Sequence, residues 1–159
     1  MITRVLFVCH GNICRSTMAE SVLTDMVKKL NIENHFEIAS AGTSREEIGN
    51  PVHYGTVGKL RQLGIPVVPH KAVQMTKADY EYYDYLIGMD SANLYNMTRI
   101  AGGTDPDKKI YKLLSFAGKD RDVADPWYTG DFDATYRDVK EGCEALLKEL
   151  KQDNKFRSE

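Results

Sequence analysis

The chain has 159 residues and a nearly balanced charge, with 21 Lys and Arg against 23 Asp and Glu and a net charge of −2. This length suits one domain with a sizeable core, and the balanced charge gives no indication of a nucleic-acid or membrane partner. The three cysteines form no even disulfide framework, and no apolar run is long enough for a signal peptide or a membrane span. We therefore expect a cytoplasmic protein, with release by a route that needs no signal peptide left open.

Strand-like and helix-like segments alternate along the chain. We predict strands at 5–9, 36–40, 84–89 and about 110–115, and helices at 16–30, about 53–64, about 76–81, 91–101 and about 131–151. Thr76-x-x-Asp79 and Ser91 are typical helix starts. This order predicts a single α/β domain over residues 1–150, with a parallel sheet covered by helices on both faces, and a polar tail over 151–159 that frays. Such sheets bind ligands at the carboxyl ends of their strands.

The segment between the first strand and the first helix has the composition of an anion-binding loop. Val5 to Val8 is an apolar run, and apolar residues recur at helical spacing from Ser16 onward, so Cys9 to Arg15 connects a strand to a helix. Free N–H groups at a helix start favour anions. Gly11 allows a tight turn and Asn12 tolerates the left-handed region, so successive N–H groups can converge. The segment therefore predicts a phosphate-binding loop.

Two side chains at the ends of this loop predict nucleophilic chemistry. Arg15 carries a planar charged fork that matches two phosphate oxygens. Cys9 faces the helix start and Arg15, so we expect it to ionise to a thiolate, which is an in-line nucleophile beneath a bound phosphorus atom. Ser16 either hydrogen-bonds this sulfur as it leaves or simply caps the helix. The loop lacks Gly-Lys-Ser/Thr, and Cys9 and Cys14 are not spaced as metal ligands, so we expect no metal and no cofactor.

The loop resembles the signature of a known family. Cys9-His10-Gly11-Asn12-Ile13-Cys14-Arg15-Ser16 is similar to the Cys-x5-Arg-Ser loop of low-molecular-weight protein tyrosine phosphatases. The similarity covers Ile2 to Leu150 and includes Ser40-Ala41-Gly42-Thr43, Ile48-Gly49-Asn50-Pro51, Asp84-Tyr85-Leu86-Ile87-Gly88-Met89-Asp90 and Asp125-Pro126-Trp127-Tyr128. It implies a four-stranded, Rossmann-like sheet and metal-independent hydrolysis of phosphotyrosine in proteins or peptides. We expect a monomer or a weak dimer.

The resemblance also implies the roles of residues around the mouth of the site. Asp125 matches the general acid, which protonates the leaving group and then activates water; by its pattern alone it is an ordinary Asp-Pro turn. Trp127 and Tyr128 match rim residues and suit a phenyl ring, although Trp127 could instead anchor its loop. Glu46 takes a place where the family often has an aromatic residue, which leaves the preferred protein substrate open.

Further positions in and near the loop also bear on the site, and two of them, His10 and Cys14, have two interpretations each. Asn12, Ser40 and His70 match a hydrogen-bond network that holds the family's loop in shape. Cys14 matches a second loop cysteine that can trap oxidised Cys9 as a disulfide, or it is a buried filler. His10 stands where the family usually has another residue, and its ring either assists the thiolate or faces solvent. Cys143 has the surroundings of a core residue on the last helix.

Three alternative functions remain. Relatives that act on phosphoarginine have a threonine-like residue in the place of Ile13, so an apolar Ile13 favours phosphotyrosine. Arsenate reductases need further cysteines, and none lies between Ile65 and Met89. A phosphate-binding module without turnover is disfavoured because the nucleophile, the arginine and the acid are all present.

Overall fold

The structure, a computed structural model, describes residues 2–154. Its centre is the predicted four-stranded parallel sheet, and its strand order is β2-β1-β3-β4. The strands are β1 (Thr3–Cys9), β2 (Phe36–Gly42), β3 (Tyr85–Gly88) and β4 (Ile110–Lys112). β1 lies between β2 and β3, with Val5 opposite both Ile38 and Tyr85.

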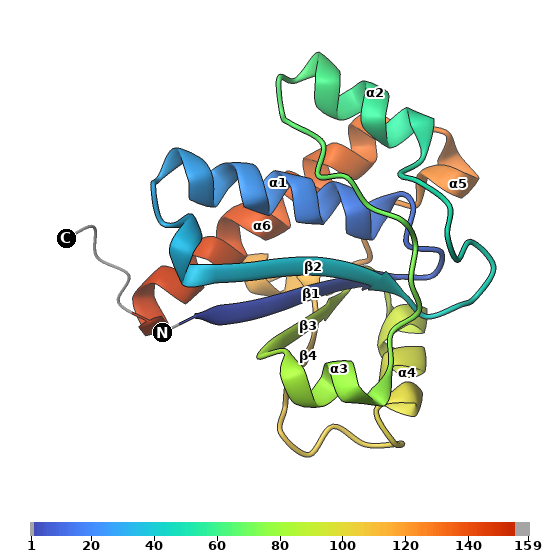
Figure 1. The fold of residues 1–159 in the computed structure, drawn as a ribbon, viewed down its shortest axis with the longest axis vertical. Coiled ribbons are helices and arrows are strands. Elements are labelled where there is room, and N and C mark those ends of the chain that lie inside the picture. The colour runs from blue at the N-terminus through green and yellow to red at the C-terminus, as the bar shows by residue number, and fades with distance from the viewer. Residues whose placement is uncertain (1, 155–159) are drawn as a thin grey trace.

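Helices cover both faces of this sheet (Figure 1). One face carries α1 (Arg15–Lys29) and α6 (Phe132–Asn154), with α2 (Tyr54–Gln62) packed against them, and the other carries α3 (Lys77–Tyr82) and α4 (Ser91–Ile100). A short α5 (Pro126–Thr129) precedes α6, and two 3-10 turns complete the elements, η1 (Glu33–His35) and η2 (Leu113–Ala117). The predicted helix starts at Thr76 and Ser91 are confirmed, since Thr76 caps α3 and Ser91 is the first residue of α4.

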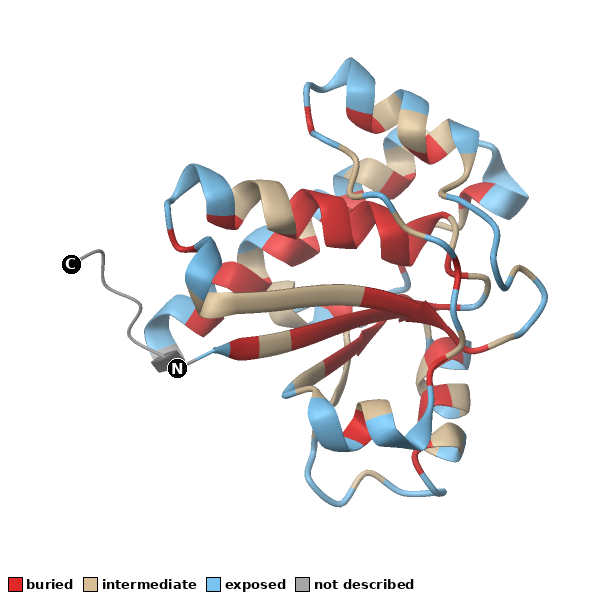
Figure 2. Ribbon diagram, in the orientation of Figure 1, coloured by how far each residue is buried: buried red, intermediate tan, exposed pale blue. Residues whose placement is uncertain are grey.

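The alternation of side chains along β1 divides the interior into two cores. Val5 and Phe7 belong to the core under α1 and α6, whereas Leu6 and Val8 belong to the core on the side of α3 and α4. Figure 2 shows the resulting buried band along β1 and the inner face of α1. Cys143 is fully buried in the first core, as expected. Burial on both faces explains why the first strand reads as an uninterrupted apolar run.

The fourth strand and the last helix differ from the predicted bounds. β4 ends at Lys112 because the chain turns into η2, where Leu113 and Leu114 both become fully buried. A continued strand would send these neighbours to opposite faces of the sheet. The last helix runs to Asn154, so the first four residues of the predicted tail are helical, and 155–159 lie outside the described residues.

The strand order positions the site. The chain moves from β1 to β2 on one side and later returns to β3 on the other side of β1, so the connections diverge at the carboxyl end of β1. Ligands bind at such a switch point in open α/β sheets. Cys9 ends β1 and Asp90 follows β3, so both lie at this edge. Within 2–154, no helix combines the length and the apolar character needed to cross a bilayer.

Candidate active site

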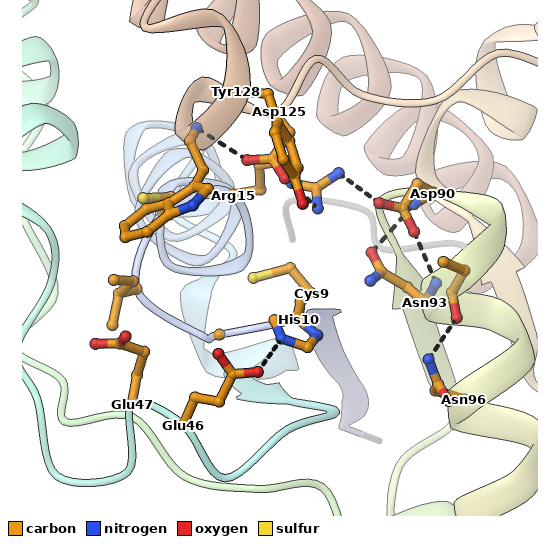
Figure 3. Close-up of a pocket in the computed structure, with 15 residues that line it drawn as sticks. Cys9, His10, Arg15, Glu46, Glu47, Asp90, Asn93, Asn96, Asp125 and Tyr128 are labelled. Carbon is orange, nitrogen blue, oxygen red and sulfur yellow. Dashed lines mark hydrogen bonds and ion pairs between the residues drawn. The ribbon is translucent and has the colours of Figure 1, made fainter.

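A cavity of about 500 Å³ opens at the carboxyl ends of β1 and β3 (Figure 3). The loop from Cys9 to Arg15 forms its floor, and Asp125 stands at its edge. Cys9 and Arg15 are both buried. The structure therefore brings the predicted nucleophile, arginine and acid to one cavity, although 110 positions separate Arg15 from Asp125 in the sequence.

The loop owes its shape to Asn12 and to Gly42, which lies beside the loop at the end of β2. Asn12 has a φ of 61°, in the left-handed region, whereas Gly11 does not need a positive φ. Gly42 at the end of β2 lies so close that an added Cβ would sit 2.8 Å from the His10 carbonyl oxygen. Two backbone bonds join the loop to this segment, from Thr43 N to Cys9 O (2.9 Å) and from Ser44 N to His10 O (3.0 Å). Only a glycine at position 42 lets β2 support the loop this closely.

The Asn12 side chain, 1% exposed, makes a hydrogen bond with every donor and acceptor that it has. Its amide donates to Ser16 Oγ (2.9 Å) and to Ser40 Oγ (3.0 Å). Its oxygen accepts from His70 Nε2 (2.7 Å) and from the Val73 N–H (3.0 Å). The structure thus brings together Asn12, Ser40 and His70 in one network. A fully paired amide can hold the left-handed conformation that an isolated residue would leave.

Ser16 does not cap α1. The helix begins at Arg15, and no side chain caps it, so Ser16 lies inside its first turn. Its Oγ accepts from the Cys9 thiol at 3.1 Å and from the Asn12 amide, and it can donate its own hydrogen to the sulfur once the thiol has ionised. The Asn12 N–H also points at Cys9 Sγ, at 3.3 Å. The capping interpretation of Ser16 is therefore wrong, and the geometry matches its contact with the sulfur.

Arg15 is buried among acceptors that orient its guanidinium (Figure 3). Nη1 contacts Asp90 Oδ2 at 2.9 Å and donates to the Val123 carbonyl at 3.2 Å, and Nη2 lies 3.3 Å from Asp125 Oδ2. Burial by itself lowers the pKa of the guanidinium, but the negative charges of Cys9, Asp125 and Asp90 raise it above its usual value. Arg15 is therefore a permanent cation held in one orientation beside the sulfur.

Asp125 is the residue that precedes α5. Its Oδ1 accepts the Trp127 N–H at 3.1 Å, and Pro126 begins the helix, so the turn is fixed from both sides. The predicted Asp-Pro loop is thus a helix start that points a carboxylate at the cavity.

Four exposed residues line the edge of the cavity, and we call them the rim: His10, Glu46, Trp127 and Tyr128. Trp127 is 67% exposed and Tyr128 is 85% exposed, so Trp127 does not anchor its loop in the core. His10 Nε2 lies 2.7 Å from Glu46 Oε2, so this ring is paired with the rim carboxylate (Figure 3). Ile13 lines the same cavity.

Three groups near the loop have shifted pKa values. Burial raises the pKa of the Cys14 thiol to about 12, and the charge of Cys9 adds to this shift. Burial also raises the pKa of Glu20 to about 7, against the hydrogen bond from Ser40 Oγ (2.6 Å). Burial lowers the pKa of His70. In the described part of the chain, no group of three or more His, Cys, Asp or Glu side chains is arranged to hold a metal ion.

The comparison with known families agrees with this geometry. The profile of a family described as low molecular weight phosphotyrosine protein phosphatase matches residues 4–156. The chain belongs to this family. The resemblance noted from the loop is thereby confirmed over nearly the whole length of the chain.

Several members of the family are similar to this chain. The low molecular weight protein-tyrosine-phosphatase YfkJ of Bacillus subtilis is 39% identical over 154 residues, which are 96% of this chain and 98% of the relative. Its crystal structure has a TM-score of 0.92 at 38% identity and covers 96% of this chain and 97% of that chain. The human low molecular weight phosphotyrosine protein phosphatase is 37% identical over 90% of this chain and 92% of its own. A Drosophila arginine phosphatase has a TM-score of 0.84 at 32% identity and covers 92% of this chain and 97% of that chain.

Two residues of the site were not predicted from the sequence. Asp90 follows the third strand, at the same sheet edge as Cys9, so the strand order contained a signal for it. Glu20 lies four positions after Ser16 on the buried face of α1, where a carboxylate is out of place without a partner. Both are bonded to predicted residues, Asp90 to Arg15 and Glu20 to Ser40.

Proposed function

We propose that the protein hydrolyses phosphotyrosine in proteins or peptides, and small aryl phosphates, through a phosphocysteine intermediate on Cys9. The observation that supports this best is that Cys9, Arg15 and Asp125 line one cavity, with Arg15 Nη2 only 3.3 Å from Asp125 Oδ2. A nucleophile, a fixed cation and an acid at this spacing suit phosphoryl transfer. Family membership supports the same reaction.

In the first step the loop N–H groups and Arg15 bind the phosphate oxygens. The Cys9 thiolate attacks phosphorus, so that an S–P bond forms while the bond from phosphorus to the tyrosine oxygen breaks. Asp125 in its protonated form gives its proton to the departing oxygen, which leaves as a phenol. Because Arg15 and the loop supply the positive charge that a divalent cation supplies elsewhere, the chain can do this chemistry with its own groups.

In the second step water attacks the phosphorus of the phosphocysteine. The Asp125 carboxylate takes a proton from that water, the S–P bond breaks, and inorganic phosphate leaves with the thiolate restored. The Ser16 hydroxyl, 3.1 Å from Cys9 Sγ, stabilises the departing thiolate. The sum is an aryl phosphate and water giving a phenol and inorganic phosphate.

The remaining residues position the substrate or the loop. Asn12, Ser40 and His70 keep the loop N–H groups converged, since their hydrogen bonds enclose the only positive φ in the loop. Trp127 and Tyr128 offer exposed rings to a phenyl group, and the exposed Glu46 contributes a charge instead of a third ring.

Cys14 adds a second reaction. Peroxide converts Cys9 to a sulfenic acid, and the Cys14 thiol then displaces water to form a disulfide that blocks phosphate binding. Thiol reductants reverse this step. Because the raised pKa keeps Cys14 protonated at neutral pH, Cys9 remains the reactive thiol of the two.

The decisive experiment compares the native enzyme with Cys9→Ser on phosphotyrosine, phosphoserine, phosphoarginine and arsenate. We expect the native enzyme to hydrolyse phosphotyrosine in the presence of EDTA, to be inhibited by vanadate, and to lose turnover when Cys9 is replaced. Turnover that persists in Cys9→Ser would contradict the mechanism.

Phosphoarginine is the competing substrate, because one structural neighbour is an arginine phosphatase. Ile13 lines the cavity, and its apolar side chain suits a phenyl ring better than a charged guanidinium. We expect Ile13→Thr to shift the ratio of kcat/KM values toward phosphoarginine. An unchanged ratio would mean that Ile13 does not select the substrate.

A further inference from the structure

Val123 and Ala124 are the two residues before Asp125. Each of their backbone N–H and C=O groups is hydrogen-bonded to a residue of another part of the chain. The Val123 N–H donates to the Met89 carbonyl at the end of β3 (2.9 Å). The Val123 carbonyl accepts from Arg15 Nη1 (3.2 Å). This residue therefore ties the acid segment to the sheet and to the arginine of the loop.

The next residue, Ala124, is held by α6. The Ala124 N–H donates to Asp138 Oδ2 (2.9 Å), and the Ala124 carbonyl accepts from Thr135 Oγ1 (2.8 Å). Thr135 and Asp138 are three positions apart, so they lie on one face of the helix. The carbonyl that Thr135 holds belongs to the peptide bond whose nitrogen is that of Asp125. The orientation of this peptide sets the starting direction of the Asp125 side chain.

The two helix residues are built into this contact. Thr135 is fully buried and Asp138 is buried, and the second oxygen of Asp138 accepts from Arg121 Nη2 at 2.8 Å. A carboxylate is rarely buried unless it is paired, and here both of its oxygens have donors. α6 thus presents one acceptor and one donor to the N–H and the carbonyl of a single residue, Ala124.

We propose that Thr135 and Asp138 are positioning residues for the general acid, which act on Asp125 through the Ala124 backbone. This inference rests on the proposed role of Asp125 in protonating the leaving group. Proton transfer requires the carboxyl within hydrogen-bond reach of the leaving oxygen, and small misplacements cost large factors in rate. If Ala124 loses its hydrogen bond to Thr135 or to Asp138, the Asp125 carboxyl samples orientations that miss the leaving oxygen.

The test uses the dependence of kcat/KM on the leaving group, because a general acid matters most for a poor one. Phenyl phosphate releases a weakly acidic phenol, and 4-nitrophenyl phosphate releases a much more acidic one. In Thr135→Val, which keeps the shape and loses the hydroxyl, we expect kcat/KM for phenyl phosphate to fall about tenfold and that for 4-nitrophenyl phosphate about twofold. Thr135→Ser restores the hydroxyl and should return both values toward those of the native enzyme.

Asp138 supplies an independent pair of variants. Asp138→Asn keeps an oxygen for the Ala124 N–H, whereas Asp138→Ala removes it. We expect the ratio of the two kcat/KM values to change in the alanine variant and to stay near the native ratio in the asparagine variant.

Thr98→Val is the matched control, since its hydroxyl donates to Leu94 O within α4 at 2.8 Å. The Thr135 hydroxyl also donates to the carbonyl four positions earlier, Asp131 O, at 3.4 Å. The control therefore removes a bond from a threonine hydroxyl to the carbonyl four positions earlier without affecting Ala124. We expect Thr98→Val to leave both substrates unaffected.

Equal losses on both substrates in Thr135→Val, or a serine variant no better than valine, would overturn the inference and leave these residues a merely structural role. Asp125→Ala separates this outcome from failure of the proposed function. If Asp125→Ala steepens the leaving-group dependence and the Thr135 variants do not, the acid assignment survives and the positioning role does not. If Asp125→Ala itself leaves the dependence unchanged, Asp125 is not the acid and both ideas fall.

Discussion

The floor of the cavity and its rim are built in opposite ways. Here the floor is taken together with the buried side chains that support it, Asn12, Arg15, Ser16, Glu20 and Ser40, whose polar atoms are bonded to one another and to their neighbours. The rim is exposed. Two of its side chains are joined by a hydrogen bond, the His10 imidazole and the Glu46 carboxylate. A buried and fully bonded floor can hold one geometry for the reaction, whereas an exposed rim can adapt to different substrates. Substitutions on the two sides should therefore differ in kind as well as in size.

The largest effect should come from the acid that stands between floor and rim. In Asp125→Ala we expect kcat/KM for phosphotyrosine to fall by about 10²–10⁴, the usual contribution of general acid catalysis. The measurement is a steady-state assay on phosphotyrosine and 4-nitrophenyl phosphate. Asp120→Ala, at an exposed carboxylate before the same segment, should leave both substrates unaffected. A negligible loss on both substrates in Asp125→Ala would remove this residue from the mechanism.

Loss of the amide at the centre of the floor should affect both rate and stability. Asn12→Ala removes four hydrogen bonds, two of them to the buried Ser16 and Ser40, and places alanine at a φ of 61°. We expect kcat/KM to fall by about 10–100-fold and the free energy of unfolding to fall by about 1–3 kcal/mol. Steady-state assays and urea unfolding measure the two.

The matched variant outside the floor is Asn96→Ala, an amide on α4 that lines the cavity and donates to Ala92 O within the same helix. We expect its stability to stay within about 0.5 kcal/mol of the native value. If Asn12→Ala lowered the free energy of unfolding no more than Asn96→Ala, the floor would not have the special structural role that we assign to it.

The floor also contains a group whose ionisation opposes folding. Burial raises the pKa of Glu20 in the native state from its ordinary value of 4.5 to about 7. Between these values the native state binds more protons at this carboxyl than the unfolded state, so the contribution of Glu20 to stability is highest below pH 4.5 and decreases as the pH rises toward 7. The full decrease is about 3 kcal/mol.

Glu20→Gln should remove this decrease and keep an acceptor for the Ser40 hydroxyl. Urea unfolding of both proteins across this pH range measures the difference, which includes the coupling of Glu20 to His70, whose Nδ1 lies 3.9 Å from Glu20 Oε1. Parallel stability curves for the two proteins would show that Glu20 ionises normally in the folded state.

The smallest effect should come from the rim. Trp127→Ala removes a ring that is 67% exposed, so we expect the KM for phenyl phosphate to rise about threefold, with kcat and stability nearly unchanged. Tyr95→Ala removes a similarly exposed ring from α4 and should leave KM unaffected. A large loss of stability in Trp127→Ala would mean that this residue belongs to the structural part of the site.

Much of the loop could be predicted from the sequence because its signals are local. An apolar run, a strand-to-helix junction, and a cysteine and an arginine at its two ends lie within about a dozen consecutive residues. Asn12 in the left-handed region was also predictable, since few residue types tolerate it. Asp125 was different: its own pattern is an ordinary turn, and only the resemblance to a family indicated its role.

Longer-range features could not be predicted in this way. The pairing of Arg15 with Asp90 depends on β3 lying beside β1, and the contact of His70 with Asn12 joins positions 58 apart. Of the two roles predicted for Ser16, the helix cap was wrong because the start of α1 depends on the bonds that the folded loop makes. The chain by itself therefore determined which atoms could attack and bind a phosphate ester, and the family resemblance added the one that could protonate it. The tertiary structure decided which neighbours hold those atoms, because sheet order and helix packing bring together groups that no local pattern connects.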